Sequence, residues 1–127
     1  MVSMTGRTVL VVEDHAPTRR AYAAFLVERG YQVLEATHGG EAILHVHRHR
    51  PDLVLLDIAL PVLDGVETAE SLREYLPAAE LRILAVTACE SGARRERMRA
   101  LCDDLLLKPC TPELIASRIG SLLGVAA

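Results

Sequence analysis

Three features are missing from this sequence. No apolar run approaches the ~20 residues that a membrane-spanning helix needs. The first residues contain no apolar segment of the kind that marks a secretion signal. Basic residues number 14 against 17 acidic ones, which excludes the strongly basic surface of a nucleic-acid binder for this segment. We therefore expect a cytoplasmic domain that binds neither nucleic acid nor a membrane.

Cysteine, aromatic residues and lysine are also scarce. The three cysteines, at positions 89, 102 and 110, form no CxxC pair, which indicates reduced thiols. Aromatic residues make up 3% of the chain, and there is no Trp. Lys108 is the only lysine, although the chain has thirteen arginines. This bias indicates a site that requires a compact ammonium on a flexible stem.

Short apolar runs alternate with longer helix-like segments along the chain. The runs predict strands at 8–12, 31–36, 53–56, 81–86 and 105–107. The intervening patterns predict helices over 17–29, 39–50 and 90–101, and a last helix from 112 onward. Between the third and fourth strands, a loop at 61–65 leads into a helix that ends at about 75. Continuous apolar strands indicate a sheet with helices on both faces, and right-handed crossovers make it doubly wound and parallel. We predict a single α/β domain of (βα)₅ type over residues 1–127, with its core at about 7–123.

Polar residues follow four of the five predicted strands. They are Glu13 and Asp14, Asp57, Thr87, and Lys108. Taken singly, each has an ordinary explanation, such as capping a helix or lying on the surface. Parallel strands, however, end at the same edge of a sheet, so we expect these side chains to meet in one pocket.

The predicted carboxylate cluster requires a cation. Carboxylates that lie close together repel one another unless a positive charge offsets them. Oxygen ligands suit Mg²⁺, which keeps several waters and takes one or two carboxylates. A carboxylate surrounded by Mg²⁺, an ammonium and a hydroxyl is suited to phosphoryl transfer, with Asp57 as nucleophile and Lys108 neutralising charge on the phosphoryl oxygens.

Five motifs resemble, in order and spacing, those of the response-regulator receiver domains of two-component signalling, the CheY-like family. They are VVED at 11–14, PDLVLLD at 51–57, LPVLDG at 60–65, VTA at 86–88 and LKP at 107–109. The resemblance covers residues 7–123 and implies a flavodoxin-like strand order, 2-1-3-4-5. It also implies a signalling phospho-acceptor that assists its own phosphorylation and dephosphorylation, not an enzyme.

The resemblance implies a role for each acidic residue of the site. Asp57 would accept a phosphoryl group from a phosphohistidine on a sensor histidine kinase or histidine phosphotransfer protein. Asp14, Asp57 and the Ala59 carbonyl would hold Mg²⁺ directly, and Glu13 would act through a water.

The resemblance assigns the phosphoryl oxygens to other groups. Lys108 would contact one oxygen, and Thr87 would move in to bind another. The backbone N–H groups of Ala59 and Ala88 would supply further donors. The peptide bond that follows Lys108 is commonly cis in this family.

The sequence departs from the family pattern at Leu105, where receivers usually have an aromatic residue coupled to the threonine. That coupling to Thr87 cannot operate in its usual form. We expect phosphorylation to be retained, with altered output through the face formed by helix 90–101, strand 105–107 and the last helix. An effector or a second copy of the domain would bind there. The alternative is a phosphorylation-independent pseudo-receiver that acts as a protein-interaction module.

Two other functions on the same fold are disfavoured. A phosphohydrolase that uses an aspartyl-phosphate needs a second acid two residues after the nucleophile, where this chain has Ala59. A flavin carrier needs a Ser/Thr-rich loop after the first strand and stacking aromatics, but residues 13–17 read EDHAP and Trp is absent. Cys89, like Ala59, is small and non-acidic, so we expect no unusually fast self-hydrolysis.

Three weaker features have both a functional and an ordinary interpretation. His45 and His49, at i and i+4, have the spacing of a metal-binding pair, but solvated helix side chains are favoured. Cys89 and Cys110 lie near the site residues as a conceivable redox pair, but small-residue packing is favoured. Four arginines form either a solvated face or a contact for an acidic partner or a second copy: Arg94, Arg95, Arg97 and Arg99.

Overall fold

The computed structural model describes residues 4–58, 62–88 and 92–125. Its elements are β1 (Thr8–Val12), α1 (Ala16–Glu28), β2 (Gln32–Ala36), α2 (Gly39–His49), β3 (Leu53–Ile58), α3 (Val62–Tyr75), β4 (Arg82–Thr87), α4 (Ala93–Leu101), β5 (Asp104–Leu107) and α5 (Pro112–Leu123). The predicted alternation of strands and helices is confirmed. Two helix starts were wrong. α3 begins at Val62, so Gly65, predicted to lie in a loop, is a buried residue of the helix. α4 begins at Ala93 and not at 90, because Gly92 has a positive φ of 111° and caps the helix.

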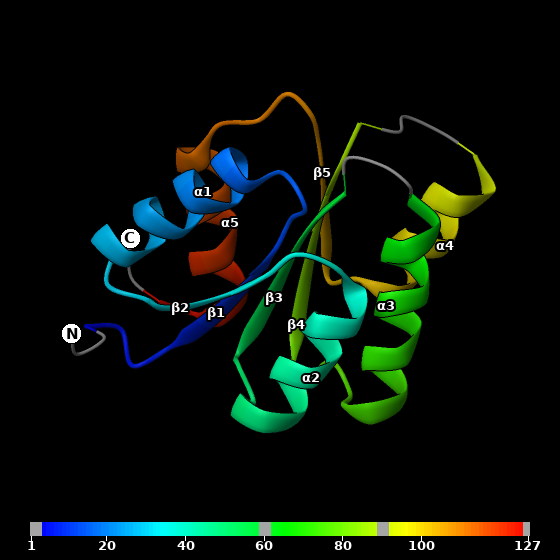
Figure 1. Ribbon diagram of the computed structural model, residues 1–127, viewed down its shortest axis with the longest axis horizontal. Coiled ribbons are helices and arrows are strands. Elements are labelled where there is room, and N and C mark those ends of the chain that lie inside the picture. Colours follow the sequence, from blue (N-terminus) through cyan, green and yellow to red (C-terminus); the bar gives the residue numbers. More distant parts are fainter. Residues whose placement is uncertain (1–3, 59–61, 89–91, 126–127) are drawn as a thin grey trace.

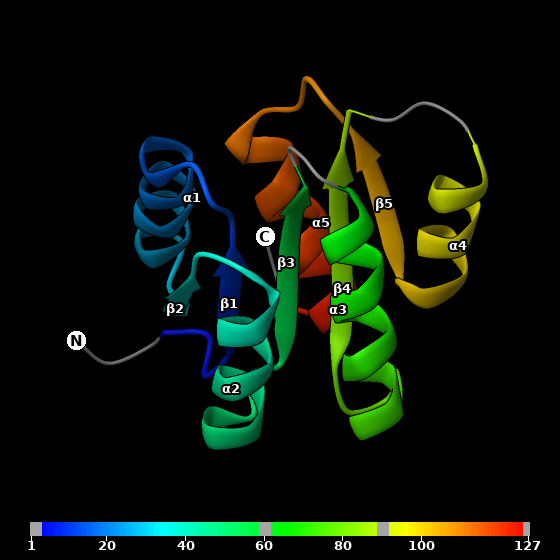
Figure 2. The same ribbon diagram turned by 45° about the vertical axis from the view of Figure 1, so that its right-hand side comes forward.

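All the strands are parallel, in the order β2-β1-β3-β4-β5, which confirms the predicted topology. Figure 2 shows the strands in this order from left to right, with their carboxyl ends toward the top. The register places Leu53 of β3 beside Val9 of β1 on one side and Arg82 of β4 on the other.

The sheet separates two helical layers. Helices α1 and α5 cover one face, and α2, α3 and α4 cover the other (Figure 1). Alternate strand residues point to opposite faces. The core on the α1/α5 side contains Val9, Val11, Leu53, Leu55, Leu84 and Val86. The core on the α2–α4 side contains Leu10, Val12, Val54, Leu56, Ile83 and Ala85.

This alternation assigns the polar residues at the strand ends to particular faces. Asp57 follows Leu55 by two residues and Glu13 follows Val11 by two, so both lie on the α1/α5 side. Thr87 follows Ala85 by two residues and therefore lies on the α2–α4 side. At the carboxyl edge of the sheet, the two carboxylates therefore lie on the α1/α5 side and Thr87 lies on the α2–α4 side.

At the other end of the sheet, Arg73 of α3 connects three segments. Its guanidinium donates to the carbonyl of Leu101 (2.8 Å), to the carbonyl of Leu81 (2.5 Å) and to the carboxylate of Asp103 (2.6 Å). The same carboxylate accepts a hydrogen bond from the backbone N–H of Ile83 (2.7 Å). Arg73 therefore fixes the end of α4 and the start of β4 against α3.

Candidate functional site

The central contact of the site is an ion pair between Asp57 and Lys108. The Lys108 Nζ lies 2.6 Å from the Asp57 Oδ1, and the Asp57 side chain is fully buried while that of Lys108 is 26% exposed. The backbone N–H of Lys108 donates to the carbonyl of Thr87 (2.9 Å), which joins the ends of β4 and β5. Apart from the ion pair, neither Asp57 oxygen has a hydrogen-bond partner in the described part of the chain. A buried carboxylate with open lone pairs is costly unless a ligand or cation completes its shell.

Glu13 lies beside this pair at the end of β1 and is 2% exposed. Its carboxylate accepts a hydrogen bond from the backbone N–H of His15 (3.0 Å). Burial raises the pKa of Glu13 to about 7, and the neighbouring Asp14 and Asp57 contribute to this rise. The His15 N–H and the Lys108 ammonium oppose it. Asp14 itself is exposed, so it forms the solvent side of the cluster.

The cluster has more negative than positive charge, since one ammonium faces three carboxyl groups. Within residues 4–58, 62–88 and 92–125, no three His, Cys, Asp or Glu side chains are arranged to hold a metal by themselves. Mg²⁺ needs only one or two carboxylates and completes its shell with water. The oxygen donors and the open lone pairs of Asp57 therefore fit a divalent cation. Ala59, whose carbonyl was predicted as a ligand, lies outside the described residues.

The remaining predicted residues lie around this centre. Thr87 is 3% exposed and ends β4, and Ala88 follows it at an exposed position. The peptide bond between Lys108 and Pro109 is cis, as the resemblance implied. Leu105 is half-buried against the core on the α2–α4 side. It therefore occupies an apolar position on the same side of the sheet as Thr87.

Sequence reasoning missed one residue of the site, Tyr22 of α1. The α1 periodicity indicates only that Tyr22 belongs to the apolar stripe, and it is indeed 9% exposed in the core on the α1/α5 side. Burial raises the pKa of its phenol, and interactions with Asp57, Cys110 and Glu13 raise it further. The available signal was a hydroxyl on an otherwise apolar stripe, eight residues after Asp14.

Comparison with known proteins identifies the family of this domain. The sequence profile of the response regulator receiver domain matches residues 9–120. This chain belongs to the receiver domain family. Like other receiver domains, it is part of two-component signalling, whose receivers interact with histidine kinases and effectors. Members of the family are signalling phospho-acceptors that generally bind Mg²⁺ at the phosphorylation site.

Curated relatives include both longer and equally short proteins. The receiver domain is 33% identical to the phosphate regulon transcriptional regulatory protein PhoB of Pseudomonas aeruginosa, over 94% of this chain and 53% of PhoB. It is 31% identical to the polar-differentiation response regulator DivK of Brucella anthropi, over 94% of this chain and 98% of DivK. The chain thus spans about half the length of PhoB and nearly all of DivK.

Solved structures share the same architecture. A CheY-like receiver domain protein from Methanospirillum hungatei superposes with a TM-score of 0.84 at 25% identity, over 93% of this chain and 94% of that one. The chemotaxis protein CheY4 of Vibrio cholerae superposes with a TM-score of 0.81 at 26% identity, over 91% of this chain and 98% of CheY4. The fold of this receiver domain is therefore that of CheY-like proteins.

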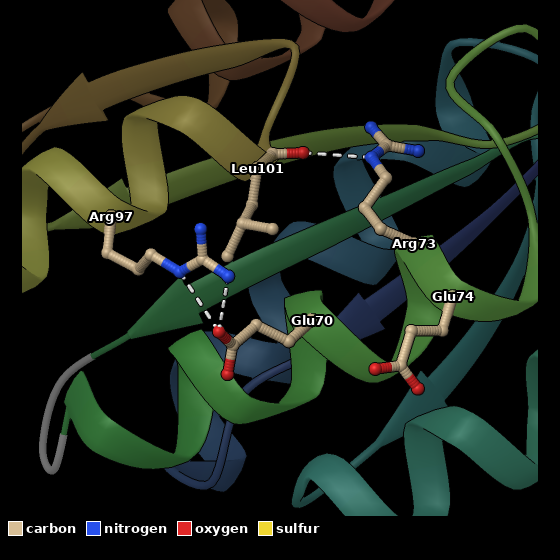
Figure 3. A pocket seen from close by; sticks show the side chains of 5 residues that line it. All are labelled: Glu70, Arg73, Glu74, Arg97 and Leu101. Atoms are coloured by element: carbon tan, nitrogen blue, oxygen red, sulfur yellow. Dashed lines mark hydrogen bonds and ion pairs between the residues drawn. The ribbon is translucent and has the colours of Figure 1, made fainter.

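One pocket lies away from the Asp57 cluster. A pocket between α3 and α4 is lined by Glu70, Arg73, Glu74, Arg97 and Leu101 (Figure 3). Arg97 closes one side of it with an ion pair to Glu70 at 2.6 Å. None of the carboxylates of the Asp57 cluster lines this pocket.

The histidines of α2 are stacked on their neighbours. The rings of His45 and His49 stack at 5.7 Å, and that of His47 stacks on Tyr75 at 3.7 Å. The described residues provide no third metal ligand beside His45 and His49.

Cys110 is half-buried against the core on the α1/α5 side. Cys89, the partner in the redox pair that the sequence analysis considered and disfavoured, lies outside the described residues. No helix in the described ranges is long and apolar enough to cross a membrane.

Proposed function

We propose that Asp57 accepts a phosphoryl group from the phosphohistidine of a sensor histidine kinase or a histidine phosphotransfer protein. The observation that carries this proposal is the Asp57–Lys108 pair: a buried carboxylate with open lone pairs facing the only ammonium side chain of the chain. A purely structural ion pair would instead have its remaining lone pairs satisfied by the protein.

In the proposed reaction, a carboxylate oxygen of Asp57 attacks phosphorus. The new O–P bond forms as the P–N bond to the donor histidine breaks, and the electron pair leaves with the imidazole. Lys108 neutralises charge on a phosphoryl oxygen, and the Thr87 hydroxyl donates to a second one. The backbone N–H groups of Ala59 and Ala88 are the further donors in this proposal.

The predicted Mg²⁺ ligands are Asp14, Asp57 and the Ala59 carbonyl, with Glu13 acting through a water. A bound Mg²⁺ supplies the positive charge that three neighbouring carboxyl groups and a transferring phosphoryl group require. Two observations support this assignment. Both Asp57 oxygens lack a hydrogen-bond partner among the described residues, and the pKa of Glu13 is raised, first by burial and then by the neighbouring Asp14 and Asp57.

We further propose that the signal leaves through the α4–β5–α5 face with an altered internal coupling. Leu105 packs in the apolar core beneath α4 and has no aromatic ring to move with Thr87. The exposed arginines of α4, Arg94 and Arg99, make this face suitable for an acidic effector or for a second copy of the domain.

The test is phosphorylation by acetyl phosphate with Mg²⁺, followed by intact mass spectrometry. Wild-type protein should gain the mass of one phosphoryl group, and Asp57→Asn should gain none. Asp14→Asn should lower the rate and the apparent affinity for Mg²⁺. Labelling of Asp57→Asn would refute the assignment. A wild-type protein that folds but is never labelled would instead support the pseudo-receiver, in which the domain acts through protein contacts alone.

A further inference from the structure

We propose that Arg19 of α1 is a positioning residue for the acidic loop at residues 13–15: through the carbonyl of Glu13 it fixes the backbone from which Glu13 and Asp14 reach the cation. The inference rests on the proposed function and deepens it, because it concerns how the chain presents its predicted Mg²⁺ ligands. Arg19 would act through Glu13 and is assigned no contact with the cation or with the acceptor carboxylate.

The guanidinium of Arg19 connects three parts of the chain. Its Nη1 donates to the carbonyl of Glu13 (3.1 Å), and its Nε donates to the carboxylate of Glu35 in β2 (3.1 Å). The side chain of Arg19 is 12% exposed, whereas that of Glu35 is 42% exposed. A surface ion pair contributes little by itself and leaves both charges in solvent. Pairing with Glu35 alone therefore does not account for a guanidinium that is mostly covered and that spends one donor on a loop carbonyl.

The carbonyl that accepts this hydrogen bond lies beyond the ladder of the sheet. β1 ends at Val12, which is also its last residue in register with β2 and with β3. Glu13 follows it and is buried, and a covered backbone carbonyl needs a donor. Arg19 lies one turn into α1 and supplies that donor.

Hydrogen bonds hold the other polar groups of Glu13 as well. Its backbone N–H donates to the carbonyl of Ala36 at the end of β2 (3.0 Å), and its carboxylate accepts from the N–H of His15 (3.0 Å). The carbonyl of Glu13 and the N–H of Asp14 belong to one planar peptide group. Fixing that carbonyl therefore sets the direction in which the chain enters Asp14. Asp14 is exposed, so core packing does not hold it in place.

The charge of Arg19 and its hydrogen bond act on cation binding in opposite directions. A guanidinium near a cation site repels the cation, so removal of the charge alone should strengthen Mg²⁺ binding. Loss of the bond to Glu13 should weaken Mg²⁺ binding, because the loop with two predicted ligands is no longer held in the geometry that binds. The sign of the change in Mg²⁺ affinity thus separates a positioning role from an electrostatic one.

The experiment compares Arg19→Met with Arg20→Met. Both variants remove one guanidinium from neighbouring positions of α1, but Arg20 is exposed. Mg²⁺ affinity is measured without a phosphoryl donor, by following the amide NMR resonances of the folded protein during titration with MgCl₂. Arg19→Met should raise the Kd for Mg²⁺ by about tenfold, the lower end of the effect of removing an outer-shell partner of a metal ligand. Arg20→Met should change it by less than about twofold, because salt screens an exposed charge.

The Mg²⁺ dependence of phosphorylation by acetyl phosphate gives a second readout. Asp57, Thr87 and Lys108 come from β3, from β4 and from the end of β5, outside the loop that Arg19 holds. Arg19→Met should therefore need about tenfold more Mg²⁺ for its half-maximal rate, and its limiting rate should stay within about twofold of wild type.

Glu35→Gln separates the two hydrogen bonds of the guanidinium. This variant keeps an oxygen that can accept from the Nε of Arg19, and it leaves the bond to Glu13 in place. Its Mg²⁺ affinity should lie within about twofold of wild type. A loss as large as that of Arg19→Met would assign the effect to the ion pair and contradict the role given to the Glu13 carbonyl.

A spectroscopic signature detects the bond without cation or phosphoryl donor. A hydrogen bond to the Glu13 carbonyl polarises the peptide group that also carries the Asp14 N–H. The amide ¹⁵N resonance of Asp14 should therefore shift in Arg19→Met and stay in place in Arg20→Met.

The outcomes separate this inference from the proposed function. If wild type binds Mg²⁺ and is labelled, but Arg19→Met binds Mg²⁺ as tightly or more tightly, the positioning role is wrong and the phospho-acceptor assignment stands. An unchanged Asp14 resonance in Arg19→Met also overturns the inference. If wild type binds Mg²⁺ but is never labelled, and Arg19→Met binds it about tenfold more weakly, the positioning role holds and the phospho-acceptor assignment has failed.

Urea unfolding shows whether each variant is folded under the conditions of the titration. If Arg19→Met does not fold, Arg19→Lys replaces it, because lysine keeps the charge but lacks the planar fork that reaches two acceptors. Folded Arg19→Lys should also bind Mg²⁺ more weakly than wild type, and an equal affinity would overturn the inference.

Discussion

Neutralisation of Glu13 is expected to remove a specific pH dependence from the stability of this receiver domain. The carboxyl is 2% exposed, and its pKa rises from 4.5 to about 7 on folding. Because the pKa is higher in the folded state, the folded protein keeps a proton that the unfolded chain has already lost. The resulting stabilisation is largest below pH 4.5, is lost as the pH rises through about 7, and changes no further above that.

The magnitude follows from the difference between the two pKa values. At about 1.4 kcal/mol for each pKa unit, Glu13 should lower the free energy of unfolding by about 3 kcal/mol between pH 4.5 and pH 8. Glu13→Gln keeps an oxygen that can accept the His15 N–H and cannot titrate, so this variant should lack that component. Groups that do not interact with Glu13 are the same in both proteins, so the difference between the two curves isolates the Glu13 cluster.

The assay is urea unfolding followed by far-UV circular dichroism, which does not require a tryptophan. Wild type and Glu13→Gln are compared at several pH values in the presence of EDTA, so that no divalent cation competes with the proton. Glu28→Gln removes an exposed carboxyl of α1 and should run parallel to wild type. If the wild-type and Glu13→Gln curves were parallel across this range, burial would not be raising the pKa of Glu13, and the description of the cluster as short of positive charge would be wrong.

Two other predictions concern the metal and the opposite end of the sheet. Mg²⁺ at about one hundred times its Kd should raise the free energy of unfolding of the wild type by about 2.7 kcal/mol at pH 8. The stabilisation should be smaller at pH 5.5, where protons compete for the same oxygens, and absent in Asp57→Asn. Equal stabilisation of that variant would place the cation elsewhere. Arg73→Met should cost about 3 kcal/mol in urea unfolding, because it removes the donor to two carbonyls and the closest cation to Asp103, which keeps only the Ile83 N–H and the more distant Arg82. Arg48→Met, at an exposed position of α2, should cost less than about 0.5 kcal/mol, and similar losses in the two variants would contradict the role given to Arg73.

Much of the fold follows from apolar runs and their order. Residues 53–56 were predicted as a buried strand, and β3 spans Leu53–Ile58, because strands covered on both faces need continuous apolar sequence. The start of α3 was placed too late, since Gly65 is a weak helix former and was interpreted as part of a turn. In the structure Gly65 is buried, so packing outweighs its low propensity.

The sequence predicts those parts of the site that lie at the ends of parallel strands, because these ends meet at one edge of the sheet. The pairing of Lys108 with Asp57 follows from parallel topology, and the structure places the two side chains 2.6 Å apart. The approach of Tyr22 was not predictable from periodicity, because a 3.6-residue repeat reports which face a residue occupies and not what its outermost atom contacts.

The scarcity of lysine has a practical consequence for anyone who handles this protein. The chain has only two kinds of amine, the α-amino group and the side chain of Lys108, because all thirteen other basic side chains are guanidinium groups. Lys108 is 26% exposed but is held by the buried carboxylate of Asp57. Acylation of residue 108 by an amine-reactive reagent therefore measures how often that ammonium leaves its partner. A single modified peptide in a mass spectrum reports the state of the site, with no label engineered into the chain.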